Sequence, residues 1–252
     1  MQNWKRRLRA SGIHLSISLC VASLAAILVF GLWYPYPYRE ISGGRALFFL
    51  VAGVDVVMGP LITLIIFNST KPRQEMAMDF TVVGLLQMAA LSYGLWTVFV
   101  ARPVHLVFEY SRMSVVHAIE VDPVFLDKAP ASLQKLPVTG PTAITLRPFR
   151  DAAEEFDATM AAIGGVPLAA RTDLWRPYAD GTVRILEAAK PAADLISRFP
   201  NHSALIGSAI ERTGKSITQL RTLPLVGRDH VWTVLLDSNT AEPLEFLPLD
   251  SL

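Results

Sequence analysis

Residues 13–33 read IHLSISLCVASLAAILVFGLW, without a charged residue. A helix of these 21 residues is long enough to cross the ~30 Å hydrocarbon core of a bilayer, because each residue adds about 1.5 Å. The run ends in WYPYPY at residues 33–38, an aromatic sequence that is typical of a membrane interface and unlike the small-residue cleavage site of a signal peptide. The stretch therefore predicts an uncleaved transmembrane helix.

Two more apolar runs follow, at residues 46–67 and 80–100, separated by the polar loop 68–79. The first of them carries a single charged residue, Asp55, near its middle. Both runs are long enough to span a bilayer. We therefore expect three transmembrane helices, at about 13–33, 46–67 and 80–100.

The composition separates this part of the chain from the rest. Overall, 52% of the residues are hydrophobic and 18% are charged, and the mean hydropathy is +0.37. Residues 1–100 hold 8 of the 23 Lys and Arg and 4 of the 22 Asp and Glu, so they carry a net +4 and the remainder a net −3. We therefore expect a membrane domain at 1–101, surrounded by lipid, and a second domain at 102–252. The total of +1 excludes the concentrated basic surface that a nucleic-acid partner requires.

The orientation follows from the positive charges that flank the spans, because these remain in the cytoplasm. Six lie in the N-terminal tail and the loop after the second span, namely Lys5, Arg6, Arg7, Arg9, Lys71 and Arg73. Four lie on the other side, namely Arg39, Arg45, Arg102 and Arg112. We expect a cytoplasmic N-terminus, and three crossings then place the second domain outside, which in a bacterial inner membrane is the periplasm.

The second domain has strand patterns at both ends and helix patterns between them. The expected strands are 104–109 and 113–119 as a hairpin, 143–146, and 231–236 with 243–247 as a closing hairpin. The expected helices are a run capped by Asp151 that ends at Ile163, then 182–190 and 201–213. This order predicts an α+β fold, so the whole chain is expected to be three transmembrane helices followed by an α+β periplasmic domain.

Residues that could carry chemistry are scattered. The five histidines lie in separate elements without metal-ligand spacing. The tetrapeptide 213–216, TGKS, resembles the end of a phosphate-binding loop, but Ala209 stands where that loop needs glycine. The single cysteine, Cys20, excludes an intrachain disulfide. We expect no catalytic residue, no metal and no cofactor.

Asp55 is the candidate functional residue of the membrane domain. A carboxylate at mid-bilayer is costly to insert, so it usually faces a protein partner, and the following Gly59 and Pro60 free backbone carbonyls and bend the helix. One interpretation is that Asp55, Gly59 and Pro60 contact another membrane helix. The alternative is a hydrogen bond within the chain, from Asp55 to Gln87 or to a hydroxyl such as Ser92 or Thr97.

Small residues form two lines at helical spacing on the first span, where they permit close helix approach. One line is Gly12, Ser16 and Cys20, and the other is Ser18, Ala22 and Ala26. Packing within the three-helix unit is the favoured use of both lines.

Several motifs resemble the TfpX/TfpZ family of type IV pilin accessory proteins. They are GLWYPYPY at 31–38, ISGG at 41–44, GVDVVMGPL at 53–61, FN at 67–68, KPR at 71–73, YGLW at 93–96, ARP at 101–103, WTVLLD at 232–237 and FLPLD at 246–250. The resemblance implies a bacterial inner-membrane protein that supports assembly of a cognate type IV pilin and is not itself an enzyme. Its implied partners are type IV pilin, which waits in the membrane as a single apolar helix with a periplasmic domain, and inner-membrane pilus assembly proteins.

Two other functions remain as alternatives. The chain could be a membrane-bound enzyme that modifies pilin, which would require a cleft of converging polar side chains. It could also be a sensor whose periplasmic domain binds a ligand, although the short cytoplasmic loop at 68–79 leaves no output domain. We expect a non-catalytic, chaperone-like accessory factor that binds pilin or the pilus machinery.

Overall fold

The computed structural model describes residues 2–67 and 71–252, and the chain divides into two compact units. Unit 1 comprises residues 1–35 and 44–101, and unit 2 comprises residues 36–43 and 102–252. The long continuous part of unit 2 begins at residue 102. The segment 36–43, which we assigned to the membrane domain from its place in the sequence, instead packs with unit 2.

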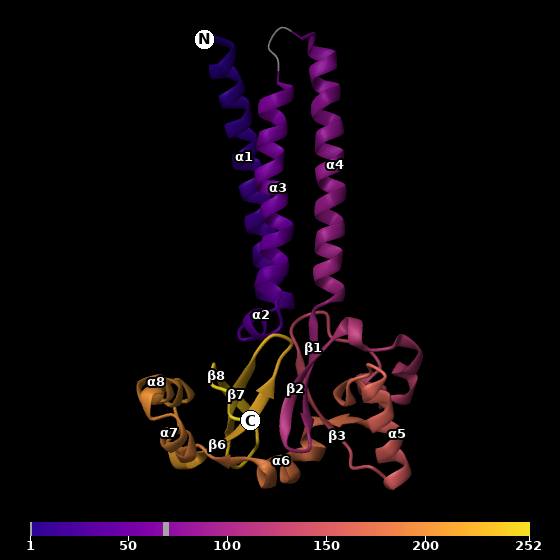
Figure 1. Cartoon of the computed structure of the whole chain (residues 1–252), viewed down its shortest axis with the longest axis vertical. Helices are drawn as coiled ribbons and strands as arrows, with labels where there is room; N and C mark the ends of the chain where they lie inside the picture. The colour runs from indigo at the N-terminus through magenta and orange to yellow at the C-terminus, as the bar shows by residue number, and fades with distance from the viewer. Residues whose placement is uncertain (1, 68–70) are drawn as a thin grey trace. The chain divides into compact units, whose positions relative to one another are not determined.

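Unit 1 consists of three long apolar helices that run side by side (Figure 1). They are α1 (Gln2–Leu28), continued by a π-helical turn, η1 (Val29–Trp33), then α3 (Gly44–Ile66) and α4 (Arg73–Val100). The three expected spans are therefore confirmed as helices long enough to cross a membrane. α4 begins before residue 80, so most of the expected loop 68–79 is helical, and residues 68–70 lie outside the described residues.

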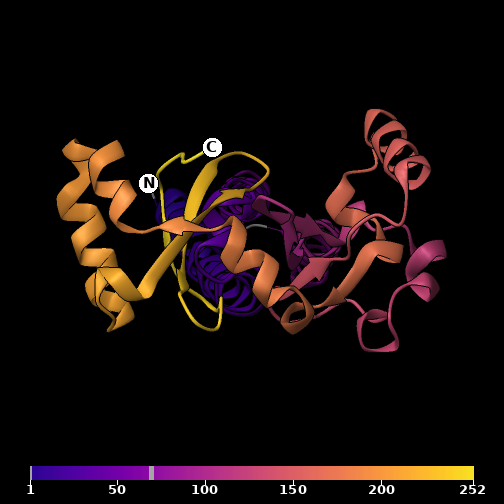
Figure 2. The same cartoon turned by 90° about the horizontal axis from the view of Figure 1, so that it is seen from below.

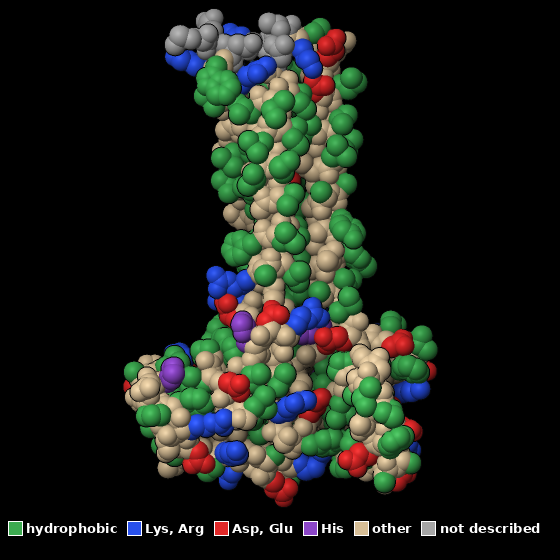
Figure 3. Space-filling model, in the orientation of Figure 1, with side chains coloured by type: hydrophobic (Ala, Val, Ile, Leu, Met, Phe, Trp, Pro, Cys, Tyr) green, Lys and Arg blue, Asp and Glu red, His purple; other side chains and the backbone are tan. Residues whose placement is uncertain are grey.

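The helices of unit 1 bury few side chains against one another. Their surface is covered by hydrophobic side chains (Figure 3), as suits helices surrounded by lipid. The buried cluster consists of Ala25, Val29, Tyr34, Phe48, Ala52 and Val98. Gly94 lets α4 approach α3 closely, because a Cβ added there would lie 2.9 Å from Cγ2 of Val51.

Unit 2 is built on a mixed sheet of eight strands, within the part of the chain that the structure describes. The strands are β1 (Pro103–Glu109), β2 (Arg112–His117), β3 (Thr142–Leu146), β4 (Trp175–Pro177), β5 (Lys190–Pro191), β6 (Leu220–Val226), β7 (Val231–Asp237) and β8 (Pro243–Leu247). Their order is β4-β3-β1-β2-β6-β7-β8, with β5 paired to β6. The β1–β3 and β2–β6 pairs are parallel and the others antiparallel.

Helices flank this sheet, so the α+β prediction is confirmed. They are α2 (Tyr38–Ile41), α5 (Ala152–Ile163), α6 (Thr182–Ala188), α7 (Ala193–Arg198) and α8 (Ser203–Thr213). Seen from below, the orange pair α7 and α8 lies at one end of the unit and the pink α5 at the other (Figure 2). α5 begins as expected, with the Asp151 carboxylate accepting the Glu154 backbone N–H at 2.8 Å.

Among the strands and α-helices that the structure describes, five were not predicted, namely α2, β4, β5, β6 and α7. The helix expected at 182–190 ends at Ala188, because Lys190 and Pro191 leave it to pair with β6 as β5. The two expected hairpins and the strand at 143–146 are confirmed.

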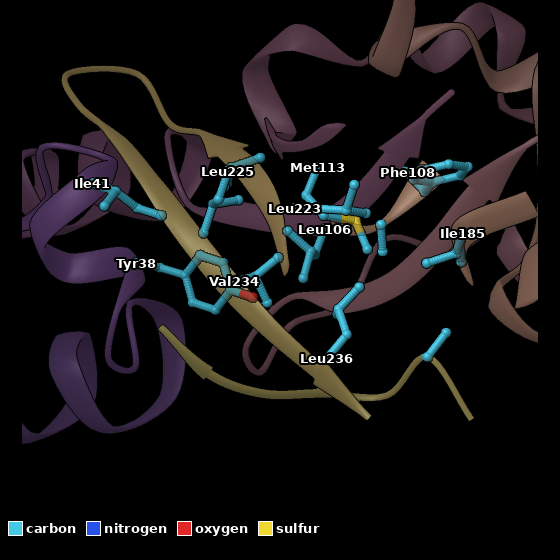
Figure 4. Close-up of a cluster of buried hydrophobic side chains, with 13 residues drawn as sticks. Tyr38, Ile41, Leu106, Phe108, Met113, Ile185, Leu223, Leu225, Val234 and Leu236 are labelled. Carbon is cyan, nitrogen blue, oxygen red and sulfur yellow. The ribbon is translucent and has the colours of Figure 1, made fainter. Parts of the chain in front are cut away.

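The largest buried cluster of unit 2 lies on one face of the sheet, and the segment 36–43 completes it. Leu106 of β1 and Val234 of β7 point into this cluster, and Tyr38 and Ile41 pack against them (Figure 4). The Asp229 N–H donates to the Ile41 carbonyl at 3.2 Å and holds the segment in place. The chain therefore passes between the two units three times, namely before residue 36, after residue 43 and after residue 101.

Candidate functional site

Polar side chains from all three helices of unit 1 meet inside the membrane-spanning region. His14 Nδ1 of α1 lies 2.5 Å from Thr63 Oγ1 of α3, and His14 Nε2 lies 2.9 Å from Gln87 Oε1 of α4. Since an amide oxygen can only accept, Nε2 is the donor to Gln87, and the Thr63 hydroxyl, which can donate or accept, pairs with Nδ1. One imidazole thus joins three helices where water does not compete for its hydrogen bonds.

Gly59 and Pro60 create the space for this cluster. A Cβ at position 59 would overlap Nε2 of Gln87 and lie 2.9 Å from Nε2 of His14. Pro60 lies inside α3, and its carbonyl accepts a hydrogen bond from Ser11 Oγ of α1 at 2.9 Å. Two of the residues proposed from the sequence as partner contacts therefore bring α1, α3 and α4 together in this structure.

Asp55 is placed differently, because its carboxylate makes no hydrogen bond to any residue that the structure describes. Of the partners considered for it, Gln87 is hydrogen-bonded to His14, the Thr97 hydroxyl donates to the Tyr93 carbonyl of its own helix, and Ser92 is exposed. Asp55 lines two cavities of about 440 and 650 Å³. The Asp55 carboxylate thus lies at the surface of the helices and accepts no hydrogen bond from a described residue.

The two lines of small residues on α1 have different surroundings. Ser18 is buried, and Ala22 and Ala26 pack against the buried cluster of unit 1. Gly12, Ser16 and Cys20 are exposed, so a role for them in packing stays a prediction.

Replacing Gln87 with leucine should loosen the three-helix unit. The change removes the hydrogen bond to His14, and interhelical hydrogen bonds in membranes are worth about 0.6–2 kcal/mol. We expect a lower melting temperature of unit 1 for the full chain in detergent, followed by loss of helical circular dichroism. Ser92→Leu on the exposed face of the same helix is the control, and an equal loss in both variants would contradict a structural role for the cluster.

Two acidic side chains of unit 2, Glu154 and Asp237, are tied into its fold. Glu154 accepts from Arg147 at 2.7 Å and from Arg150, and the Arg147 hydrogen bond is the main reason why the pKa of Glu154 is well below its usual range. Asp237 forms an ion pair with Lys215 that lowers its pKa in the same way. In the described parts of the chain, no group of His, Cys, Asp and Glu is arranged to hold a metal ion.

The TGKS stretch ends a helix. α8 ends at Thr213, and Gly214 adopts a φ of +66°, a left-handed conformation that suits glycine at a helix end. Together with the Lys215 ion pair, this geometry confirms the structural interpretation of the tetrapeptide.

His105 is a buried titratable group in the sheet. Its Nδ1 lies 2.9 Å from Thr142 Oγ1, and its ring meets Trp175 edge-on with centroids 4.7 Å apart. Burial lowers the pKa of His105 to about 4. At neutral pH the folded unit therefore holds this imidazole uncharged, with a proton on only one of its ring nitrogens.

Unit 2 should lose stability as the pH falls from about 6.5 to 4. In that interval the unfolded chain binds a proton at His105 and the folded chain does not, so the free energy of unfolding decreases with falling pH, by up to about 3 kcal/mol. Urea midpoints of the full chain at pH 7 and pH 5 measure the loss, and His105→Gln should reduce it. The exposed His202→Gln is the control, and an unchanged loss in His105→Gln would refute the assignment.

Comparison with known proteins supplies the functional context. A family model described as "Fimbrial assembly protein FimB" matches residues 2–43. The fimbrial assembly proteins of serogroups I and E1 of Dichelobacter nodosus are each 34% identical to the chain over 236 residues, which is 92% of this chain and 91% of each relative. That of serogroups C1 and C2 is 41% identical over 122 residues, covering 48% of this chain and 91% of the relative. No solved structure matches the chain.

Proposed function

The chain belongs to the family of fimbrial assembly proteins, and from this premise we propose that it is a non-catalytic accessory factor of the bacterial inner membrane. In this proposal it binds type IV pilin, or the machinery that polymerises it, and supports entry of the subunit into the fibre. The similarity to fimbrial assembly proteins over 92% of the chain is the observation that carries the proposal. The finer placement in the TfpX/TfpZ group rests on the WYPYPY and VDVVMGP motifs.

A helper of this kind needs two surfaces, because its client has a transmembrane helix and a globular periplasmic domain. Unit 1 offers helices that are able to span a membrane, and unit 2 offers a folded α+β domain. The cluster of Lys5, Arg6, Arg7 and Arg9 favours a cytoplasmic N-terminus. Unit 2 then faces the periplasm, on the same side as the domain of the client.

A binding role also agrees with the use of the charged side chains in unit 2. Glu154 and Asp237 are engaged in ion pairs that fasten a helix or a turn to the sheet. Groups held in this way contribute to folding rather than to proton transfer. We therefore propose that the chain acts by contact and not by modifying its client.

Deleting the gene in its native host tests the proposal. We expect few surface fimbriae, an undiminished pool of subunit in the membrane, and recovery when the full chain is restored. A strain that lacks the chain and still assembles a normal quantity of fimbriae would refute it. A fall in total subunit together with the fibres would indicate a role in subunit synthesis or stability instead.

A further inference from the structure

A groove runs along the surface of unit 1 between α3 and α4. On α3 it is lined from Leu47 to Ile66, and on α4 from Val82 to Val98. Its volume is about 650 Å³, and many of its side chains are exposed, such as Met58 at 49%. The groove is therefore a surface of the three helices that they do not cover themselves.

The length of the groove matches one membrane span. From Leu47 to Ile66 the α3 helix rises about 28 Å at 1.5 Å per residue, close to the ~30 Å hydrocarbon thickness of a bilayer. The groove follows two nearly continuous helix faces, so its natural occupant is a third helix that lies lengthwise. A lipid tail would fill the apolar length but offers no hydrogen-bond donor.

The groove is lined mostly by apolar side chains, but at one depth it has polar ones. Asp55 and Gln87 line it there, and the Asp55 carboxylate accepts no hydrogen bond from any described residue. Within the structure, the amide nitrogen of Gln87 is also buried without a partner among those residues. A carboxylate without a partner at mid-membrane is costly, and an occupant that donates a hydrogen bond to Asp55 gains that energy on binding.

We infer that the α3–α4 groove binds a single apolar transmembrane helix, which donates a hydrogen bond to Asp55 at mid-membrane. Resting on the proposed function, the inference identifies this helix as that of the fimbrial subunit. The exposed hydroxyls on α1 of a second copy fit less well, because Ser16 and Ser23 already donate to carbonyls of their own helix.

Matched positions on the same helices allow a direct test. Val54 faces the groove and Val57 does not, yet each is 55% exposed. Leu86 faces it and Leu85 does not, and each is 66% exposed. A photo-crosslinking amino acid is placed at each of the four positions in the full chain, which is co-expressed in membranes with an epitope-tagged subunit of the same organism. We expect at least five times more subunit adduct at positions 54 and 86 than at 57 and 85.

Removing the carboxylate tests the hydrogen bond. Asp55→Leu should lower the adduct at position 54 about three- to tenfold, while Asp55→Glu and Asp55→Asn, which keep an acceptor oxygen, should retain most of it. Because Asp55 has no hydrogen-bond partner in the described structure, these variants should accumulate normally in the membrane, which immunoblotting checks. The paired positions in the unchanged chain test the groove even where a variant fails to accumulate.

Several results would overturn the inference. Equal subunit adducts within each matched pair, adducts only with a second copy, or an unchanged yield in Asp55→Leu would each do so. Subunit adducts that appear only outside the groove would overturn it and still leave the proposed function supported. The proposed function fails separately, when deletion of the gene leaves the fimbriae normal.

Discussion

Replacing Trp175 with alanine will lower the free energy of unfolding of unit 2 by about 3–5 kcal/mol, the usual cost of emptying a core aromatic site. The Trp175 side chain is fully buried between β-strand residues such as Val107 and Ile144. Its Nε1 also donates to the Ala169 carbonyl at 2.7 Å, so the change removes packing and leaves a buried acceptor unpaired. Pulse proteolysis of the full chain in detergent across a urea series measures the loss.

Phe156→Ala on α5 provides the comparison, because Phe156 is 63% exposed. That variant should change the free energy of unfolding by less than about 0.5 kcal/mol. If the two variants lost the same stability, Trp175 would not be a core residue of a cooperatively folded unit.

Replacing Gly227 with alanine will release the segment 36–43 from unit 2. An added Cβ would overlap the backbone oxygen of Ile41 and lie 2.8 Å from its Cβ, and a backbone cannot yield as a side-chain tip can. Either the strain remains or Tyr38 and Ile41 leave the core. In both cases we expect the free energy of unfolding of unit 2 to fall by about 2–4 kcal/mol. Tryptic cleavage after Arg39, followed by mass spectrometry, reports release of the segment.

Gly207→Ala is the matched control for this substitution. No atom lies within 4 Å of a Cβ at position 207, and alanine favours a helix over glycine by up to about 1 kcal/mol. It should leave cleavage at Arg39 unchanged. Rapid cleavage in both variants, or in neither, would contradict the packing of the segment against Gly227.

The membrane helices could be predicted from sequence because uncharged apolar length is sufficient to identify them. The site inside them could be predicted only in part, since hydropathy identifies Asp55 as costly but does not show which side chains share its depth. His14 lies 20 residues before Tyr34, and Thr63 lies 19 residues after Gly44. Two helices that run side by side from the same connection, here residues 34–44, place residues at equal distances from it at the same depth. The similar spacing of His14 and Thr63 therefore indicated that the two side chains could meet.

The sheet shows where local patterns are insufficient. β6 contains Pro224, which argues against a central strand because proline donates no hydrogen bond. On one edge of β6, the pairing with β5 involves β6 residues up to Thr222, and the pairing with β2 involves β6 residues from Leu225 onward. Pro224 lies between these two paired stretches, so its missing N–H costs no hydrogen bond with either strand. The burial of segment 36–43 in unit 2 could not be predicted for a related reason, since it depends on strands more than 60 residues away in the sequence.

Purification of the tagged full chain in mild detergent, followed by intact-mass measurement of the fimbrial subunit that elutes with it, tests the central claim most directly. The account predicts that the subunit co-elutes and has the same mass as subunit from a strain that lacks the chain. A subunit whose mass differs between the two strains, or the absence of both subunit and assembly machinery from the eluate, would contradict it.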